Sequence, residues 1–232
     1  MTSNAVSSAA DLAAARADLF RLLAGGFLHP SPEFAQGLVD GAFQADLRAC
    51  VTMLDWPAAD AARAAAHLDD ATARLAALDP DAVYHELAVE YSRLFIGPGT
   101  IVVSPYESIH LDGTPEMRAL VMVSRSSKAV LAAYREAGLE RGRESNEPPE
   151  HIATELEFMY FVCFREAAAL AECDEAGSSA WETRRVAFLG EHLQAWLPGL
   201  CKTVADESRV PLYVDLAEIL SSTLVVETGR AG

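Results

Sequence analysis

Three times in this chain, a residue that favours a helix N-terminus stands directly before a proline and a run with apolar residues at helical spacing. The pairs are Ser31–Pro32, Asp79–Pro80 and Thr114–Pro115. A serine, aspartate or threonine side chain can accept a hydrogen bond from the unpaired N–H groups of a first helical turn. Proline fits into that turn because it has no N–H to leave unpaired. Each pair therefore predicts the start of a helix, and a run with apolar residues at helical spacing follows each one.

Helical patterns cover nearly the whole chain. The predicted helices are 9–28, a short one from 31, 42–56, 58–78, one from 79 to the break at Gly97–Pro98–Gly99, 114–137, 149–172, 180–196, 200–208 and 211–226. Ser179 and Glu182 predict a capping box for the helix over 180–196, and Pro198–Gly199 predicts its end. Only the segment "IVVS" has a β-like pattern, and four residues do not make a sheet. We therefore predict an all-α protein, a single compact domain over 1–232 of about nine to ten helices, with an ordered core from about 9 to 227.

The charge balance excludes some classes of partner. The chain has 34 acidic and 18 basic residues and a formal net charge of −16. Such a chain repels phosphate backbones, so we expect no nucleic-acid partner, whereas a basic peptide would be attracted. An acidic composition also serves solubility alone. No run of about 18 apolar residues and no signal-peptide pattern is present, so we expect a cytoplasmic protein without stable membrane association.

No enzyme motif appears in the sequence. There is no phosphate-binding loop, dinucleotide fingerprint or zincin motif, and the four cysteines lack zinc-site spacing. The segment "ESIH", Glu107 to His110, has the spacing of a carboxylate di-iron site, but such a site needs a second copy of the motif. Arg184–Arg185 lies inside a predicted helix and is not an export signal. We predict no catalytic residue, no metal and no cofactor.

The aromatic residues are predicted to serve packing. Phe158, Phe161 and Phe164 form a stripe at helical spacing, with Tyr160 beside it pointing outward. Such a stripe is typical of a helix face in the core. Trp56, Trp181 and Trp196 are also expected in the core rather than at a contact surface.

The stretch "NEPPEHIATELEFM", residues 146–159, allows two interpretations. Glu147 and Glu150 suit a helix N-terminus because of its dipole. A protonated His151 would oppose that dipole, and such a local conflict indicates function. Carboxylates one helical turn away, at Glu147 and Glu155, would raise the pKa of His151. Glu150 and His151 are not a catalytic pair, because neighbouring side chains on a helix point about 100° apart.

Two stretches resemble the TorD/DmsD/NarJ family of chaperones for redox-enzyme maturation. The first is "EYSRLFIGPGTIVVSPYESIH", with its aromatic residue, Leu-Phe, Gly-Pro and Pro-x-Glu-Ser. The second is "NEPPEHIATELEFM", in which Glu147, Pro149, Glu150–His151 and "ELEFM" resemble the family's Glu-x-Pro-x-Asp-His and Glu-Leu-x-Phe-Met, with Glu150 in place of the aspartate. Weaker similarities lie in "LFRLLAGGFLHPSPEF" and "HLQAWLPGLCKTV".

The resemblance implies a TorD-like fold and a non-enzymatic role. It implies a partner, the catalytic subunit of a molybdopterin enzyme of the DMSO-reductase type, bound directly or through its twin-arginine signal peptide until the cofactor is inserted. The residues it implies for client binding are Tyr91, Phe95, Gly97, Pro98, Glu107, Ser108, Glu147, Pro149, Glu150, His151 and Glu155. A receptor for a signal peptide needs an apolar groove and an acidic rim. Residues 97–114 are the predicted groove wall, and the six Glu and two Arg within 140–157 are the predicted rim.

Several alternatives stay open at this stage. The client can be held by its folded body without signal-peptide recognition, as in the NarJ-like branch of the family. An acidic helical scaffold or a weak nucleotide hydrolase is the alternative to a chaperone. The sequence names neither the client's substrate nor the oligomeric state, monomer or homodimer.

Overall fold

A computed structural model of the chain describes residues 8–97, 101–111, 124–139 and 148–231. Over these ranges the chain is helical, with one isolated antiparallel bridge between Tyr106 and His151 and no strand. The helices are α1 (Ala9–Gly26), α2 (Pro32–Val39), α3 (Ala42–Met53), α4 (Ala58–Leu75), α5 (Pro80–Tyr91), the π-helical η1 (Ser92–Ile96), α6 (Glu107–Leu111), α7 (Arg125–Glu136), α8 (Ile152–Ala171), α9 (Glu175–Phe188), the π-helical η3 (Leu189–Leu193), α10 (Gln194–Glu207) and α11 (Pro211–Ala231). The prediction of an all-α fold is confirmed.

Two of the three predicted cap-and-proline starts are confirmed. The Ser31 side chain accepts from Phe34 N–H at 3.2 Å, and the Asp79 side chain accepts from Ala82 N–H at 3.3 Å. The third, Thr114–Pro115, lies outside the described residues. A helix running without a break from 114 to 137 is wrong, because Ser124 has extended backbone and is the N-cap of α7.

The predicted start of the helix at 180 is wrong. Helix α9 begins at Glu175, where the Asp174 side chain accepts from Gly177 N–H at 2.9 Å, and Ser179 lies inside it. The predicted end at Pro198 is also wrong, since Pro198 lies within α10. Pro198 is the fifth residue of α10, after η3 has ended at Leu193, and the helix continues through it.

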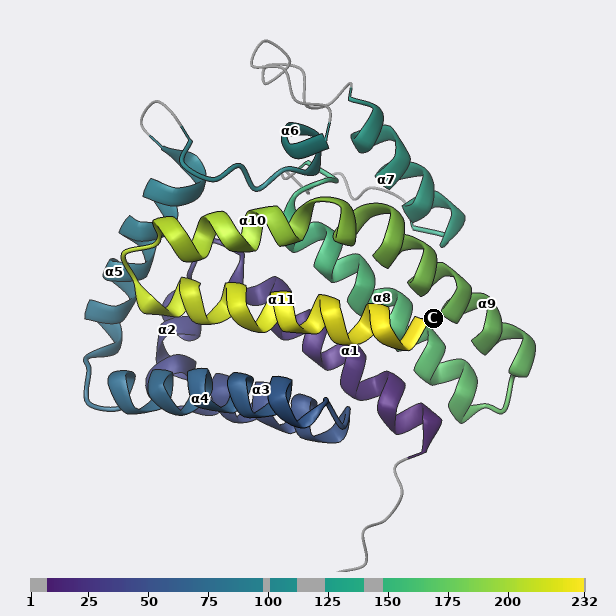
Figure 1. Cartoon of the computed structure of the whole chain (residues 1–232), viewed down its shortest axis with the longest axis horizontal. Coiled ribbons are helices and arrows are strands. Elements are labelled where there is room, and N and C mark those ends of the chain that lie inside the picture. The colour runs from purple at the N-terminus through teal and green to yellow at the C-terminus, as the bar shows by residue number, and fades with distance from the viewer. Residues whose placement is uncertain (1–7, 98–100, 112–123, 140–147, 232) are drawn as a thin grey trace, which may run out of the picture.

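The helices pack around a core shared by the two ends of the sequence (Figure 1). Helix α1 runs along α8, α9 packs on the other side of α8, and α10 lies side by side with α11. Helices α3 and α4 pair below them, and α4 contacts α11. At the contact between α1 and α11, a Cβ added to Gly26 would come within 2.8 Å of Leu216, so glycine permits this close approach.

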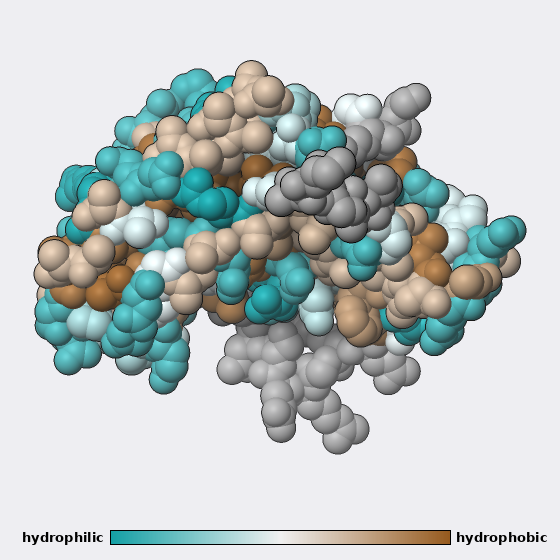
Figure 2. Space-filling model, turned by 90° about the horizontal axis from the view of Figure 1, so that it is seen from below, coloured by the Kyte–Doolittle hydropathy of each residue, from teal (hydrophilic) through white to brown (hydrophobic). Residues whose placement is uncertain are grey.

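The surface in Figure 2 is mixed in character. Hydrophobic areas on this face are small and separate, and lie among larger hydrophilic areas. Within the described ranges, none of the helices has the length and hydropathy needed to span a membrane.

Candidate functional site

The two stretches singled out in the sequence are joined in space. Glu107 N–H donates to the Glu150 carbonyl at 3.1 Å, and Ile152 N–H donates to the Pro105 carbonyl at 2.9 Å. These two bonds make the antiparallel bridge between Tyr106 and His151. The start of α8 is therefore held against the irregular segment that leads into α6.

An open cleft of about 420 Å³ lies where the two stretches meet. Its lining residues come from the end of α1, from α5 and η1, from the segment before α6 and from the start of α8. They are Leu28, His29, Tyr91, Phe95, Ile96, Pro105, Tyr106 and His151. No Asp, Glu, Lys or Arg side chain is among them, so the cleft offers an apolar and aromatic surface.

The aromatic side chains of the cleft are held in place by contacts with neighbouring buried residues. Tyr91 donates its hydroxyl to the Phe27 carbonyl at 3.4 Å, and its ring lies 5.0 Å from that of Phe95. The Phe95 ring also contacts Phe27 and Tyr213, at 6.4 and 6.1 Å between centroids. These contacts preorganise the wall, which favours binding because little side-chain freedom is left to lose.

The mouth of the cleft carries exposed apolar side chains. Ile96 is 55% exposed and Leu28 is 40% exposed. Gly97 follows Ile96 with φ 62° and ψ 144°, a conformation suited to glycine, and ends η1. The π-helical turn therefore presents Phe95 inward and Ile96 outward at consecutive positions, and such turns are frequent at functional sites.

His151 is neutral in this structure, which corrects the expectation of a raised pKa. It is the N-cap of α8, and its Nδ1 accepts from Ala153 N–H at 3.2 Å. Burial lowers the pKa of His151 to about 4. A neutral imidazole that accepts a hydrogen bond at a helix N-terminus is compatible with the helix dipole. The conflict that the sequence suggested, between a protonated His151 and that dipole, therefore does not arise. The Glu155 carboxyl accepts from Trp196 and not from the His151 ring.

Glu150 is fully buried behind the cleft. Its carboxyl accepts from the Ser108 hydroxyl at 2.7 Å and from the Ser124 hydroxyl at 3.5 Å. Burial raises the pKa of this carboxyl. Glu150 therefore joins α6, the N-cap of α7 and the start of α8 from the inside.

Two further glutamates are buried next to it. Glu155 accepts from the Trp196 indole N–H at 3.1 Å through Oε2, and its Oε1 is also buried. Burial, and then the nearby Glu107, raise the pKa of Glu155 well above its ordinary value. Glu107 is held by His192, whose Nδ1 lies 2.9 and 3.2 Å from its two oxygens. We call Glu107, Glu150 and Glu155 the carboxyl cluster.

Nothing in this arrangement points to a reaction. His110 Nε2 lies 2.8 Å from the Ser104 carbonyl, so Glu107 and His110 do not converge on a common point. No group of three His, Cys, Asp or Glu that could hold a metal ion occurs in the described part of the chain. Burial raises the pKa of the Cys163 and Cys201 thiols, which makes both poor nucleophiles.

The predicted residues divide into two groups. Tyr91, Phe95 and His151 line the cleft, and Gly97 adjoins it. Glu107, Ser108, Glu150 and Glu155 lie behind it, as does Pro149, whose carbonyl accepts from the Tyr134 hydroxyl at 2.8 Å. Pro98 and Glu147 lie outside the described residues, as does most of the predicted acidic rim.

Five lining residues were not named individually by the prediction. Pro105 and Tyr106 lie within the predicted groove wall over 97–114, and Ile96 lies in the first quoted stretch. Leu28 and His29 lie in the weaker similarity over 19–34.

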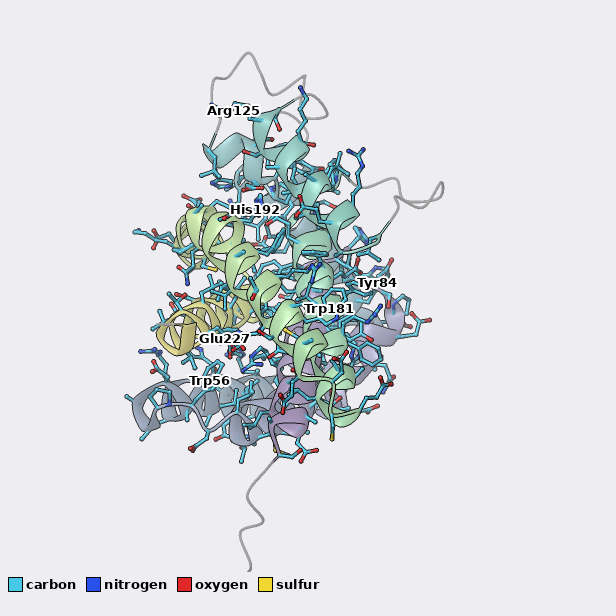
Figure 3. All side chains as sticks on the ribbon, turned by 90° about the vertical axis from the view of Figure 1, so that its right-hand side faces the viewer. Trp56, Tyr84, Arg125, Trp181, His192 and Glu227 are labelled. Carbon is cyan, nitrogen blue, oxygen red and sulfur yellow. The ribbon has the colours of Figure 1, made fainter. Side chains whose placement is uncertain are left out.

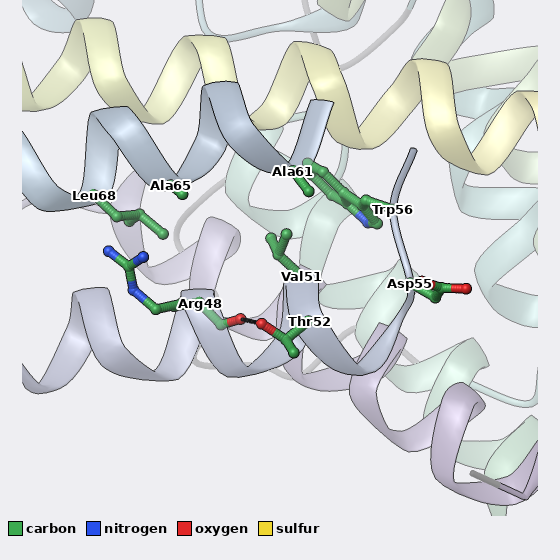
Figure 4. Close-up of a pocket in the computed structure, with 8 residues that line it drawn as sticks. All are labelled: Arg48, Val51, Thr52, Asp55, Trp56, Ala61, Ala65 and Leu68. Carbon is green, nitrogen blue, oxygen red and sulfur yellow. Dashed lines mark hydrogen bonds between the residues drawn. The ribbon is translucent and has the colours of Figure 1, made fainter. Parts of the chain in front are cut away.

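A second cavity, of about 350 Å³, lies between α3 and α4 (Figure 4). Arg48, Val51 and Thr52 face Ala61, Ala65 and Leu68 across it, with Trp56 at the connection between the helices. None of the residues predicted for client binding lines this cavity. The cleft at Tyr91 is therefore the stronger candidate site.

Comparison with known proteins gives one family for the chain. The model of the family described as nitrate reductase delta subunit matches residues 57–202. The selenate reductase assembly chaperone protein of Thauera selenatis is 32% identical over 158 residues, and the chlorate reductase assembly chaperone protein of Ideonella dechloratans is 30% identical over 156. Each match covers 67% of this chain and 75% of the relative. The Tat proofreading chaperone DmsD of Salmonella typhi is 27% identical over 155 residues, which is 67% of each chain.

Proposed function

We propose that this chain, which belongs to the nitrate reductase delta subunit family, is an assembly chaperone for the catalytic subunit of a molybdopterin-dependent reductase. Its relatives are named as assembly chaperones of selenate and chlorate reductases. The observation that carries the proposal is the cleft, where Tyr91 and Phe95 from one quoted stretch meet His151 from the other. In this role the chain performs no reaction and acts in the cytoplasm, before the client is exported.

The cleft would take an apolar segment of the client. Its lining is aromatic and aliphatic, and its one residue from the second stretch, His151, is neutral. Exposed Ile96 and Leu28 extend the apolar surface beyond the mouth. A twin-arginine signal peptide has such a segment in its apolar region, and an unfinished catalytic subunit exposes others. Burial of that segment would supply most of the affinity.

The basic part of a client peptide would be attracted without contacting the carboxyl cluster. Those three carboxyls are buried, so an arginine of the client has no access to them in this structure. The net charge of −16 still produces a field that raises the association rate of a basic peptide. Added salt should therefore slow association and leave the dissociation rate nearly unchanged.

A matched pair of variants tests the cleft. Ile96→Glu places a charge at its mouth, whereas Val89→Glu makes a similar change at a site on α5 that is 71% exposed and does not line it. Binding of the full chain to the catalytic subunit of a molybdopterin reductase from the same genome would be measured, with the cofactor content of that subunit after co-expression. We expect Ile96→Glu to weaken binding at least about tenfold, roughly 1.4 kcal/mol, and to lower cofactor content.

Val89→Glu should leave both measurements close to those of the unchanged chain. Both positions are exposed, so neither variant should lower the free energy of unfolding by more than about 0.5 kcal/mol. Equal binding by the two variants would remove the cleft from the proposal. No binding of any reductase subunit by the unchanged chain would end the chaperone role itself.

A further inference from the structure

Trp181 of α9 is contacted by two arginines. The guanidinium carbon of Arg165, on α8, lies 4.9 Å from the indole centroid, and that of Arg184 lies at the same distance. The Phe161 ring meets the indole edge-on, with centroids 5.7 Å apart. Figure 3 faces this side of the molecule and labels Trp181 on it.

This group lies at the edge of the core: Phe161 and Trp181 pack against the core and are partly exposed, whereas the prediction that Phe164 is core is wrong. Trp181 and Phe161 are half-buried, and Phe164 is 53% exposed. Arg165 is exposed and Arg184 is partly exposed. We call Phe161, Phe164, Arg165, Trp181 and Arg184 the arginine–aromatic surface.

The two stacked arginines lack the carboxylate partners that several other described arginines of this chain have. Arg16, Arg21, Arg48, Arg63, Arg74, Arg93 and Arg185 each form an ion pair. Over the described ranges neither Arg165 nor Arg184 forms one, although Arg184 donates to the Ala180 carbonyl at 3.1 Å. Glu182, beside them on α9, pairs with Arg185 instead. Among the described arginines that form no ion pair, these two share one indole.

Stacking prepares these arginines to bind an anion. A guanidinium that lies on an aromatic face keeps its N–H edge available for a carboxylate. The indole also limits the freedom of the side chain, so less entropy is lost when the hydrogen bonds form. Exposed Phe164 supplies an apolar contact next to them. Arginine and aromatic residues are the types enriched where proteins bind each other.

We propose that the arginine–aromatic surface docks an acidic segment of a partner protein. Carboxylates of that segment pair with Arg165 and Arg184, and an apolar side chain contacts Phe164. Nucleic acids and anionic membranes present many like charges to the whole molecule, and its net charge of −16 repels them. A short acidic segment carries far fewer charges, so this repulsion is smaller and pairing with the two guanidinium groups can outweigh it.

The surface is separate from the cleft. Arg165 lies about 20 Å along the axis of α8 from His151, at 1.5 Å per residue. No residue is common to the two sites. The proposal therefore does not rest on the proposed function, and either can fail alone.

The chain contains its own fluorescent reporter for this site. Trp56 and Trp196 are buried, whereas Trp181 is half-buried. A short synthetic peptide of Glu, Asp and Leu would be added to the full chain while tryptophan emission is recorded. The peptide with Gln and Asn in place of Glu and Asp is the uncharged probe. We expect saturable quenching by the acidic peptide and at least about tenfold weaker binding of the uncharged one.

The double variant Arg165→Gln with Arg184→Gln should weaken binding of the acidic peptide at least about tenfold. Its charge-matched control is Arg21→Gln with Lys202→Gln, which alters exposed cations elsewhere and should bind like the unchanged chain. Equal affinity of the double variant and the control would overturn the proposal. Binding of anionic lipid vesicles in preference to the peptide would also overturn it, and so would a dimer of this chain that only the double variant disrupts.

Discussion

Helix α8 passes two buried polar clusters, and their charges are balanced in different ways. The carboxyl cluster lies at its start, behind the cleft. The second cluster, which we call the ionic network, consists of Arg16, Glu166, Arg185 and Glu227 and joins α1, α8, α9 and α11. His192, which contacts the carboxyl cluster, and Glu227 of the network lie at different levels of the helix stack in Figure 3.

The ionic network is neutral by composition. Arg16 Nε lies 2.6 Å from Glu227 Oε2, and Arg185 Nε lies 2.8 Å from Glu166 Oε2. Arg185 also reaches Glu227 at 3.5 Å. Each charge therefore has an opposite charge beside it, and all four side chains are buried. Such a network fixes how the four helices meet, because removal of one member leaves a buried charge unpaired.

The carboxyl cluster is not balanced in this way. Glu107 lies against the imidazole of His192, whereas Glu150 and Glu155 have no cation beside them among the described residues, and burial raises the pKa of both. A buried carboxyl without a counter-charge becomes neutral by keeping its proton. The network thus serves the fold over a wide pH range, whereas the stability of the region behind the cleft depends on pH. Unbalanced polar groups of this kind cluster at functional sites.

The largest difference between the two regions should appear when the network loses a member. Arg185→Ala leaves Glu166 without its closest cation, and we expect the free energy of unfolding to fall by about 3–5 kcal/mol. The neighbouring Arg184 is partly exposed and forms no ion pair with a described residue, so Arg184→Ala should cost less than about 1 kcal/mol. Urea unfolding of both variants measures this.

Client binding, measured with the same two variants, separates an effect on stability from an effect on function. Affinity per folded molecule should be unchanged in Arg185→Ala, because the network lies away from the cleft. A small loss of stability in Arg185→Ala, close to that in Arg184→Ala, would contradict the structural role of the network.

A smaller effect of opposite sign, a gain in stability, is expected when Glu155 is replaced. Its folded-state pKa is raised, so the stability it contributes is present below its unfolded pKa near 4.5 and is lost as pH rises through the folded value. Glu155→Gln keeps an acceptor for Trp196 and has no proton to lose. The variant should therefore gain stability relative to the unchanged chain as pH rises from 5 to 8. Melting curves at these two pH values measure the gain, and an equal difference at both would contradict it.

Local rules predicted much of this fold and little of its chemistry. Ser31–Pro32 and Asp79–Pro80 could be read from the sequence because a cap acts on its own helix turn. At the start of α9 two caps compete, Asp174 and Ser179. The chain turns at Cys173 with φ 57°, so Asp174 comes first, and no local rule contains that turn.

The candidate site was predicted in part. Tyr91, Phe95 and His151 were found from the two motifs. The burial of Glu150 and the proton state of His151 depend on packing between segments far apart in the sequence, which spacing along one helix does not report. The same holds for Ile96 and Phe164, whose exposure has no signature in helical periodicity.

The smallest effect we predict concerns His151, which belongs to both the cleft and the helix start. His151→Ala removes the acceptor for Ala153 N–H, and at pH 7.5 the loss of this cap should cost about 0.5–2 kcal/mol of unfolding free energy. His151→Asn keeps a neutral cap acceptor, so it should lie close to the unchanged chain at that pH. A binding role for the ring predicts that both variants also lose client affinity, because both lack the imidazole in the cleft.

The pH dependence of the asparagine variant separates the cap from the ring's titration. The folded pKa of His151 is lowered to about 4 from 6.5, so the unfolded chain takes up a proton first as pH falls. The stability from the neutral ring is complete above pH 6.5 and is lost as pH falls toward 4. Asparagine does not titrate, so between pH 7.5 and pH 5 His151→Asn should gain on the order of 1–2 kcal/mol relative to the unchanged chain. Unfolding curves at both pH values test this. If the two proteins lose equal stability between pH 7.5 and pH 5, the His151 ring is protonated in the folded chain. The description of the cleft as apolar, with a neutral imidazole in its wall, would then be wrong.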